Sequence, residues 1–236
     1  MIKNRLQEFG KSVWTDKRKR KILIFSLSPF ALAGLALLIF YSIKYYDSQI
    51  ADQSFMTGNP CKAPCWYGLV PGVSSDTEIM QKLPQLTFID THSIVRNEGS
   101  FWPGNQPHMI YFNCKNIQKT QCGFLIVTDD RLKFINLYLQ YNLMLSQVIK
   151  KLGPPEYIDY YHDIINPPNP VFIAELSWPE NRIVTQLQIN DASQEKALLH
   201  GAKLPGKLTV NEIYYVDSEY FGFDAPGERL PWPGIQ

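Results

Sequence analysis

The sequence predicts an α+β protein, with an N-terminal transmembrane helix followed by two repeats of a short helix plus an antiparallel sheet. Three observations support this fold class. Residues 22–43 are apolar and uncharged. Two later segments have the caps and spacing of short helices, and each is followed by strand-like runs. The predicted order is a basic cytoplasmic segment (1–21), a transmembrane helix (22–43), a stalk (44–60) and two ectodomain repeats (61–140 and 141–236).

The apolar run contains 22 residues without a charge. As a helix rising about 1.5 Å per residue it would be about 33 Å long, close to the roughly 30 Å of a bilayer core. The alternative is a cleaved signal peptide, whose apolar region is usually about 7–15 residues. This run is longer and no small-x-small cleavage site follows it, so we expect an uncleaved membrane anchor.

Charge predicts the orientation of that anchor. Residues 1–21 contain eight Lys or Arg side chains, five of them in the run Lys17–Lys21. Basic flanks stay in the cytoplasm, so we expect a single-pass protein of the cell membrane with a cytoplasmic N-terminus and an extracytoplasmic C-terminal domain. The remaining residues carry 15 basic and 20 acidic side chains. An acidic body argues against nucleic acid as a partner.

Four cysteines outside the cytoplasm are disulfide candidates: Cys61, Cys65, Cys114 and Cys122. Three pairings are possible. Local pairing, Cys61 with Cys65 and Cys114 with Cys122, is favoured because "NCKNIQKTQC" has the pattern of a hairpin tip between two apolar runs. The crossed pairings remain open.

Each repeat begins with a helix pattern. In the first, Ser75 and Glu78 have the spacing of a capping box, and Pro84 ends the apolar face. In the second, apolar residues recur at i, i+3, i+4 and i+7, and Gly153 can form a C-terminal cap; these residues are Leu145, Val148, Ile149 and Leu152.

Strand-like runs follow both helices, with "TDDR" and "PENR" as turns between neighbouring runs. Alternation is clearest in the run 134–139, which predicts a sheet with one covered face. A further short helix, capped by Asp191, interrupts the second repeat.

These motifs carry a resemblance. Pro-Gly before a capped helix and "LGPP" after the second helix are similar to the tandem repeat of the beta-lactamase-inhibitor-protein fold, whose single-repeat form occurs in small outer-membrane assembly lipoproteins. The order C-x3-CW-x-G-x2-PG, "LGPP" and a terminal "LPWPG" resembles uncharacterised membrane-anchored exported proteins of filamentous green non-sulfur bacteria.

The resemblance covers roughly residues 61–236 and implies a fold used to bind other proteins. It brings no catalytic residue. Two features depart from the pattern: no lipid-accepting cysteine directly follows the apolar run, and Pro84 stands where a Gly usually ends the first helix.

The sequence predicts no catalytic residue, no cofactor-binding motif and no metal site. "CKAPCW" has the Cys-Trp order of some cysteine proteases, but the rest of that signature is missing. Zinc would require a second close cysteine pair, and Cys114 and Cys122 are too far apart in sequence. We therefore expect a disulfide at Cys61 and Cys65, and a protein that is not an enzyme.

Aromatic residues near Pro and Gly are the better functional candidates, because large rigid rings bury much area at small entropic cost. We expect Trp66 and Trp178 to lie in the core. The candidate interaction surface comprises Phe101, Trp102, Tyr67, Phe221 and Trp232.

The resulting hypothesis is a non-enzymatic membrane protein whose extracytoplasmic domain binds or scaffolds a protein partner at the cell envelope. Two alternatives remain open. One is an exported hydrolase with a site assembled from distant residues. The other is a cell-wall or polysaccharide-binding module that uses aromatic faces as sugar platforms.

Overall fold

The computed structural model describes residues 31–42, 52–98, 107–115, 120–163, 171–219 and 228–235. The chain divides into two units, Met1–Gln49 and Ile50–Gln236. In the first unit, residues 31–42 form a helix whose side chains are exposed; the other residues of the predicted transmembrane run lie outside the described residues. Within the described ranges, no helix is long and apolar enough to cross a membrane.

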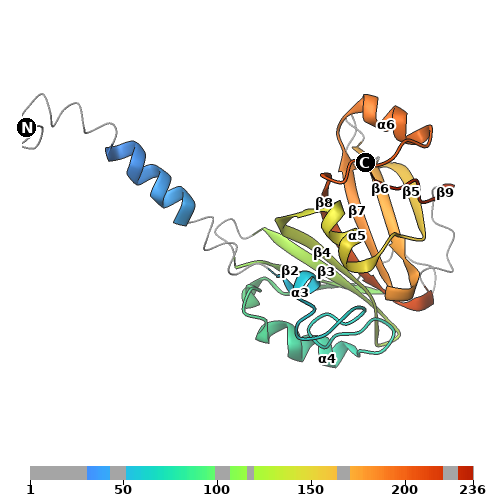
Figure 1. The fold of residues 1–236 in the computed structure, drawn as a ribbon. Helices are drawn as coiled ribbons and strands as arrows, with labels where there is room; N and C mark the ends of the chain where they lie inside the picture. Colours follow the sequence, from blue (N-terminus) through green and yellow to red (C-terminus); the bar gives the residue numbers. More distant parts are fainter. Residues whose placement is uncertain are drawn as a thin grey trace, which may run out of the picture. The chain divides into compact units, whose positions relative to one another are not determined.

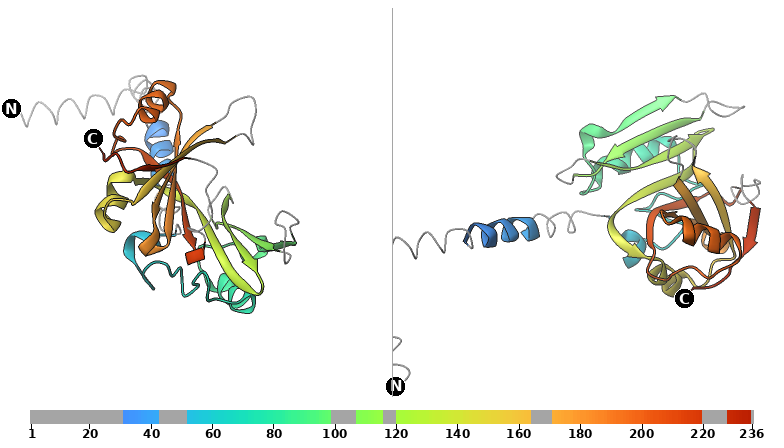
Figure 2. Two further views of the ribbon diagram at one scale, coloured as in Figure 1. Left: turned by 90° about the vertical axis from the view of Figure 1, so that its right-hand side faces the viewer. Right: turned by 90° about the horizontal axis from the view of Figure 1, so that it is seen from above.

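Nine strands of the second unit form one antiparallel sheet in the order β1-β2-β3-β4-β8-β7-β6-β5-β9 (Figure 1 and Figure 2). Their bounds are β1 (Val95–Glu98), β2 (His108–Asn113), β3 (Gln121–Thr128), β4 (Arg131–Met144), β5 (Tyr157–Asp163), β6 (Val171–Trp178), β7 (Ile183–Ile189), β8 (Thr209–Val216) and β9 (Glu228–Pro231). The helices are α3 (Ser54–Thr57), α4 (Asp76–Lys82), α5 (Leu145–Leu152) and α6 (Ala192–Leu199), with 3-10 turns η1 (Leu83–Gln85), η2 (Thr91–Ser93) and η3 (Pro179–Asn181).

The prediction of two separate helix-plus-sheet repeats is wrong. Each half does contain a short helix followed by antiparallel strands, α4 before β1–β4 and α5 before β5–β8. However, β4 pairs with β3 on one side and with β8 on the other, so both halves share one sheet. Pairing at this junction satisfies backbone groups that two separate sheets would leave on exposed edges.

Local sequence signals set the ends of the helices as expected. Ser75 Oγ accepts a hydrogen bond from the Glu78 amide at 3.3 Å, and the Glu78 carboxylate accepts one from the Ser75 amide at 3.2 Å. Asp191 caps α6 by accepting hydrogen bonds from the next turn. Gly153 follows α5 with φ 83°. These contacts confirm the two predicted N-terminal caps, whereas Gly153, with ψ −176°, does not adopt the left-handed helical conformation expected of it.

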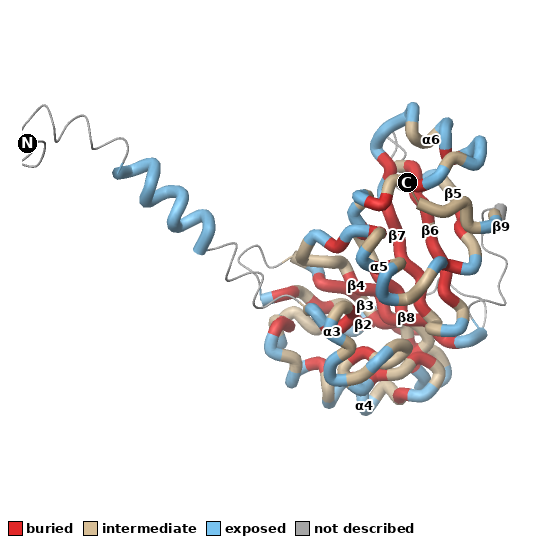
Figure 3. The backbone as a smooth tube through the Cα atoms, in the orientation of Figure 1, coloured by how far each residue is buried: buried red, intermediate tan, exposed pale blue. Residues whose placement is uncertain are grey.

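Helices α3, α4, α5 and α6 all contribute to the main hydrophobic core on one face of the sheet. Buried residues of this core include Phe55 of α3, Ile79 of α4, Val148 of α5 and Leu198 of α6. Trp66 and Trp178 also lie in this core, 0% and 3% exposed, as predicted. Figure 3 shows β6 and β7 almost wholly buried, whereas α6 is exposed over much of its length.

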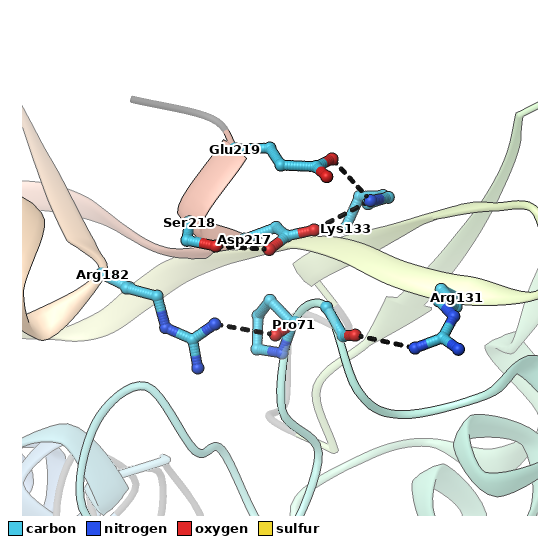
Figure 4. Close-up of polar contacts among 8 residues, drawn as sticks. Pro71, Arg131, Lys133, Arg182, Asp217, Ser218 and Glu219 are labelled. Atoms are coloured by element: carbon cyan, nitrogen blue, oxygen red, sulfur yellow. Dashed lines mark hydrogen bonds and ion pairs between the residues drawn. The ribbon is translucent and has the colours of Figure 1, made fainter. Parts of the chain in front are cut away.

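The Pro71-Gly72 turn contacts both halves of the sheet, through Arg131 at the start of β4 and Arg182 directly before β7 (Figure 4). Arg182 Nη1 donates to Pro71 O at 3.1 Å, and Arg131 Nη1 donates to Gly72 O at 3.3 Å. Gly72 has φ +81°, and a Cβ placed on it would lie 2.7 Å from Asp217 Oδ1. The glycine is therefore required by both conformation and space.

Asp217 also ties the two halves together. Lys133 Nζ of β4 lies 2.8 Å from Asp217 Oδ2 and 2.9 Å from Glu219 Oε2 (Figure 4). Hydrogen bonds to Asp217 and Glu219 raise the pKa of Lys133. Burial acts to raise the pKa of Asp217, but its contacts with Lys133 and Ser218 outweigh burial and lower it.

Candidate functional site

The face of the sheet opposite the helices carries a band of aromatic side chains. Cross-strand neighbours share a face of a sheet, and the pairs Tyr111 with Phe124 and Asn136 with Tyr214 place these residues opposite the core. The aromatic band consists of Tyr111, Phe124, Phe134, Tyr138 and Tyr214.

Phe124 lies at the centre of this aromatic band. Its ring centroid is 5.8 Å from that of Tyr111, 6.0 Å from Phe134 and 6.5 Å from Tyr138. Phe134 continues the contact to Tyr214 at 5.1 Å. Tyr111, Phe124, Phe134 and Tyr138 are partly exposed. Tyr214 is buried, and the other four rings of the aromatic band form a connected apolar surface that remains accessible to solvent.

Polar groups border the aromatic band at β8. Asn136 Nδ2 donates to Glu212 Oε2 at 2.6 Å, and the Tyr214 hydroxyl donates to the same oxygen at 3.3 Å. Burial, together with the charge of Glu212, raises the pKa of Tyr138 to about 12. Tyr138 therefore stays protonated at neutral pH and can donate a hydrogen bond.

Further along this face, three carboxyl groups lie in one row across β5, β6 and β8. Asp159 pairs with Glu175, Glu175 pairs with Gln186, and Gln186 pairs with Glu212. We call Asp159, Glu175 and Glu212 the carboxyl row. The Tyr161 hydroxyl donates to Glu175 Oε1 and accepts from Gln186 Nε2, both at 2.8 Å.

Burial dominates the electrostatics of Glu175, the middle member of the carboxyl row. It raises the pKa of Glu175 from an ordinary 4.5 to about 7, and the charges of Asp159 and Glu212 add to the increase. The hydrogen bond from Tyr161 acts in the opposite direction. Glu175 is therefore partly protonated near neutral pH.

The predicted interaction residues fall in different places. Phe101, Trp102 and Phe221 lie outside the described residues. Trp232 packs against the main core. Tyr67 does too, and its ring centroid lies 5.4 Å from that of Phe88. None of the predicted residues that the structure describes belongs to the aromatic band.

Tyr67 belongs instead to a polar cluster around Asp52. Trp66 Nε1 donates to Asp52 Oδ2 at 2.7 Å, and the Ser54 amide donates to Asp52 Oδ1 at 2.8 Å. Burial, followed by interaction with Asp52, raises the pKa of Tyr67. Tyr67 adopts φ 50° in a tight turn whose flanking residues, Trp66 and Leu69, form a β-bridge.

Both predicted local disulfides are present, Cys61–Cys65 and Cys114–Cys122. Cys114 and Cys122 close the β2–β3 hairpin, where the Cys114 amide donates to Thr120 O at 2.9 Å. In the described part of the chain no cysteine is left free, and no three His, Cys, Asp or Glu side chains converge as a metal site.

His108 of β2, a residue that a hydrolase could use, is held by two charged side chains. His108 Nε2 lies 3.0 Å from Asp76 Oδ1, and Arg96 Nη2 lies 3.3 Å from His108 Nδ1. Arg96 Nη1 also donates to Asp76 Oδ2 at 2.6 Å. Both ring nitrogens of His108 are thus used to link α4 to β1 and β2. This arrangement is a structural clamp.

The predicted interaction surface did not include the aromatic band, because its residues were chosen among aromatics near Pro and Gly, whereas the band lies within strands. The alternation of Phe134 and Tyr138 with Ile135 and Leu137 was visible, but it did not show which set would be covered. The register of β4 with β8 decides this, because Ile135 faces buried Tyr215 and Phe134 faces the other side.

Comparison with known proteins gave no match to any family model, to any curated protein or to any solved structure.

Proposed function

We propose that residues 52–236 form a binding domain at the cell envelope that captures a protein partner on the aromatic band. The observation that carries this proposal is the run of contacting, partly exposed rings from Tyr111 through Phe124 and Phe134. Met109 and Ile126, which pair across β2 and β3, extend the same surface.

A partner that covers the aromatic band would bury its exposed rings. Aromatic residues bury large areas at low entropic cost and dominate the energetics of many interfaces. Tyr111, Phe124 and Ile126 do not pack against the main core, so partner contact is what would remove their exposed area from water. Glu212 at the border gives the surface an acidic edge, which favours a partner with basic side chains around an apolar centre.

Two disulfides support a location outside the cytoplasm, because thiols are kept reduced inside it. The cytoplasmic N-terminus and the single membrane span stay predictions of the sequence. Protease treatment of intact cells tests this location: the C-terminal domain should be digested only if it is outside.

Site-specific photocrosslinking tests the binding surface. Benzoylphenylalanine replaces Tyr111 or Phe124 in the full-length protein in cells, and Val73 serves as a control because it is 66% exposed outside the band. We expect discrete protein adducts from the two band positions and none from Val73. The same adducts from Val73, or no adducts from either band position, would overturn the proposal.

Matched methionine variants measure the energetic contribution once a crosslinked partner is identified. Met109→Ala removes an apolar side chain beside the aromatic band, whereas Met80→Ala makes the same change on α4, where Met80 is 40% exposed. Phe124→Ala should weaken binding by about 30-fold or more, as central aromatic residues of interfaces do. Met109→Ala should weaken it less, and Met80→Ala not at all.

Polysaccharide binding is the competing outcome of these experiments. If purified cell-wall polysaccharide retains the protein, and Phe124→Ala abolishes the retention while no protein adduct forms, the band is a sugar platform and the proposed protein partner is wrong.

A further inference from the structure

A cavity of about 350 Å³ lies on the helix-covered side of the sheet. Its walls come from α3, the Cys61–Cys65 loop, the end of α5 and β8. Tyr215 lines it, and Tyr214, the next residue in β8, belongs to the aromatic band. Successive side chains of a strand point to opposite faces. The cavity is therefore a separate site from the aromatic band.

Its volume lies in the range typical of small-molecule sites, about 300–1,000 Å³. Buried residues form its deeper part: Phe55 is 5% exposed and Tyr215 is 2% exposed. Ala63 and Leu152 add apolar walls. This part of the cavity suits a compact apolar body.

Two hydroxyl groups accompany these apolar walls. Burial raises the pKa of Tyr215 well above 10, the charge of Asp52 adds to the increase, and interaction with the Ser54 hydroxyl acts in the opposite direction. Tyr215 therefore keeps its proton and can donate a hydrogen bond. Ser54 Oγ is buried, and no hydrogen bond of ordinary geometry reaches it from the described part of the chain. A ligand oxygen would satisfy it.

Two lysines, Lys62 and Lys151, line the exposed side of the cavity. A Cβ placed on Gly58 would lie 3.8 Å from Lys62 Cγ and 4.0 Å from Lys151 Nζ, so both side chains pass close to this glycine. Lys151 Nζ donates to Met56 O at 3.1 Å and lies 5.9 Å from the centre of the Phe55 ring. The Lys62 carbonyl accepts from the Cys65 amide at 3.0 Å, but among the described residues its ammonium group forms no hydrogen bond or ion pair.

The charges of the lining are one-sided. Lys62 and Lys151 are cationic, and none of the described residues that line the cavity is an Asp or Glu. An anion in the cavity would gain charge-assisted hydrogen bonds from these lysine side chains, while an apolar body would cover Phe55. We propose that this cavity binds a small organic anion, a carboxylate or phosphate attached to an apolar body.

The Cys61–Cys65 disulfide has a role in this site, because Cys61, Lys62 and Ala63 all line the cavity. The closed loop restricts Lys62 to the rim, so less conformational entropy is lost when a ligand binds. Replacing Cys61 and Cys65 by Ser should therefore weaken anion binding several-fold. The matched control replaces Cys114 and Cys122, whose disulfide does not contribute to this cavity.

The experiment is a thermal unfolding assay on the full-length protein in a non-ionic detergent. The probes are benzoate, phenyl phosphate and octanoate at about 10 mM, each compared with a neutral analogue such as benzamide. Binding to the folded state raises Tm by mass action, and we expect an increase of about 2 °C or more for at least one anion. Vesicles of anionic and of zwitterionic phospholipid form a second arm.

Lysine variants tie any effect to the cavity. Lys62→Gln and Lys151→Gln should each reduce the affinity about 10-fold or more, and Lys62→Glu should abolish the shift. Lys207→Gln is the control, since Lys207 is exposed and lies outside the cavity lining. Phe124→Ala in the aromatic band should leave anion binding unchanged, which separates this inference from the proposed partner site.

Each outcome decides the proposal. A shift with soluble anions that is lost in the cavity variants supports a free organic acid as the ligand. Stabilisation by anionic vesicles alone, lost in the same variants, supports the same chemistry with a lipid headgroup as its source. No stabilisation by any anion, or stabilisation that survives in both Lys62→Gln and Lys151→Gln, would overturn the proposal.

Discussion

Glu175 offers a quantitative test of how the sheet buries charge. The change is Glu175→Gln, which removes the ionisable proton but keeps an oxygen that can accept the hydrogen bond from the Tyr161 hydroxyl, 2.8 Å away in the native protein. The groups facing Glu175 across the sheet are Asp159, Gln186 and Glu212 by direct or near-direct register. Two of these are carboxyls, so ionised Glu175 meets repulsion as well as burial.

The free-energy cost of ionising Glu175 in the folded protein follows from its raised pKa. Burial raises the pKa of Glu175 from 4.5 to about 7, and each pKa unit corresponds to about 1.36 kcal/mol. Ionised Glu175 therefore destabilises the folded protein by about 3 kcal/mol at most. The folded state binds this proton more tightly than the unfolded state, so this contribution lowers the free energy of unfolding as pH rises from about 4.5 to 7. Above about pH 7 the ionised form prevails, and this contribution lowers the free energy of unfolding no further.

The assay is urea unfolding of the full-length protein at about pH 4 and at about pH 8. Glu175→Gln should match the wild type at the lower pH and exceed its free energy of unfolding by roughly 1–3 kcal/mol at the higher pH. Glu180→Gln makes the same charge change at an exposed position. Its free energy of unfolding should stay within about 0.5 kcal/mol of the wild-type value at both pH values. If Glu175→Gln is no more stable at pH 8 than its control, the reasoning is wrong.

Three further predictions concern the described contacts. Gly72→Ala should lower the free energy of unfolding by roughly 2–4 kcal/mol. The control, Gly201→Ala, has the same φ of +81° but open space around its Cβ, and should lower it by about 1 kcal/mol. Equal losses in urea unfolding would contradict a clash with Asp217. Trp66→Phe removes the hydrogen bond to the Asp52 carboxylate and should cost roughly 2–3 kcal/mol by the same assay, with a loss below about 0.5 kcal/mol counting against this role. Alkylation of the unreduced, denatured protein should add no label by intact mass, since all four cysteines are paired; two or four labels would refute one or both disulfides.

Short-range features of the fold were predictable because the interacting groups are close in the chain. The capping box of Ser75 and Glu78 joins residues three apart, and Asp191 caps α6 through the turn that follows it. Cys114 and Cys122 are eight positions apart, at the tip of one hairpin. Such contacts close small loops, so their entropic cost is low and the local sequence suffices to indicate them.

The tertiary structure decided what depends on residues far apart. Strands β4 and β8 pair through residues such as Ile135 and Tyr215, and this pairing converts two expected sheets into one. The same register determines that Phe134 and Phe124 lie on the accessible face, and it brings Glu175 into line with Asp159 and Glu212. Lys62 and Lys151 meet at one cavity although they belong to different halves of the chain. A strand's alternation specifies two faces but not which of them the rest of the chain covers, because that depends on long-range packing.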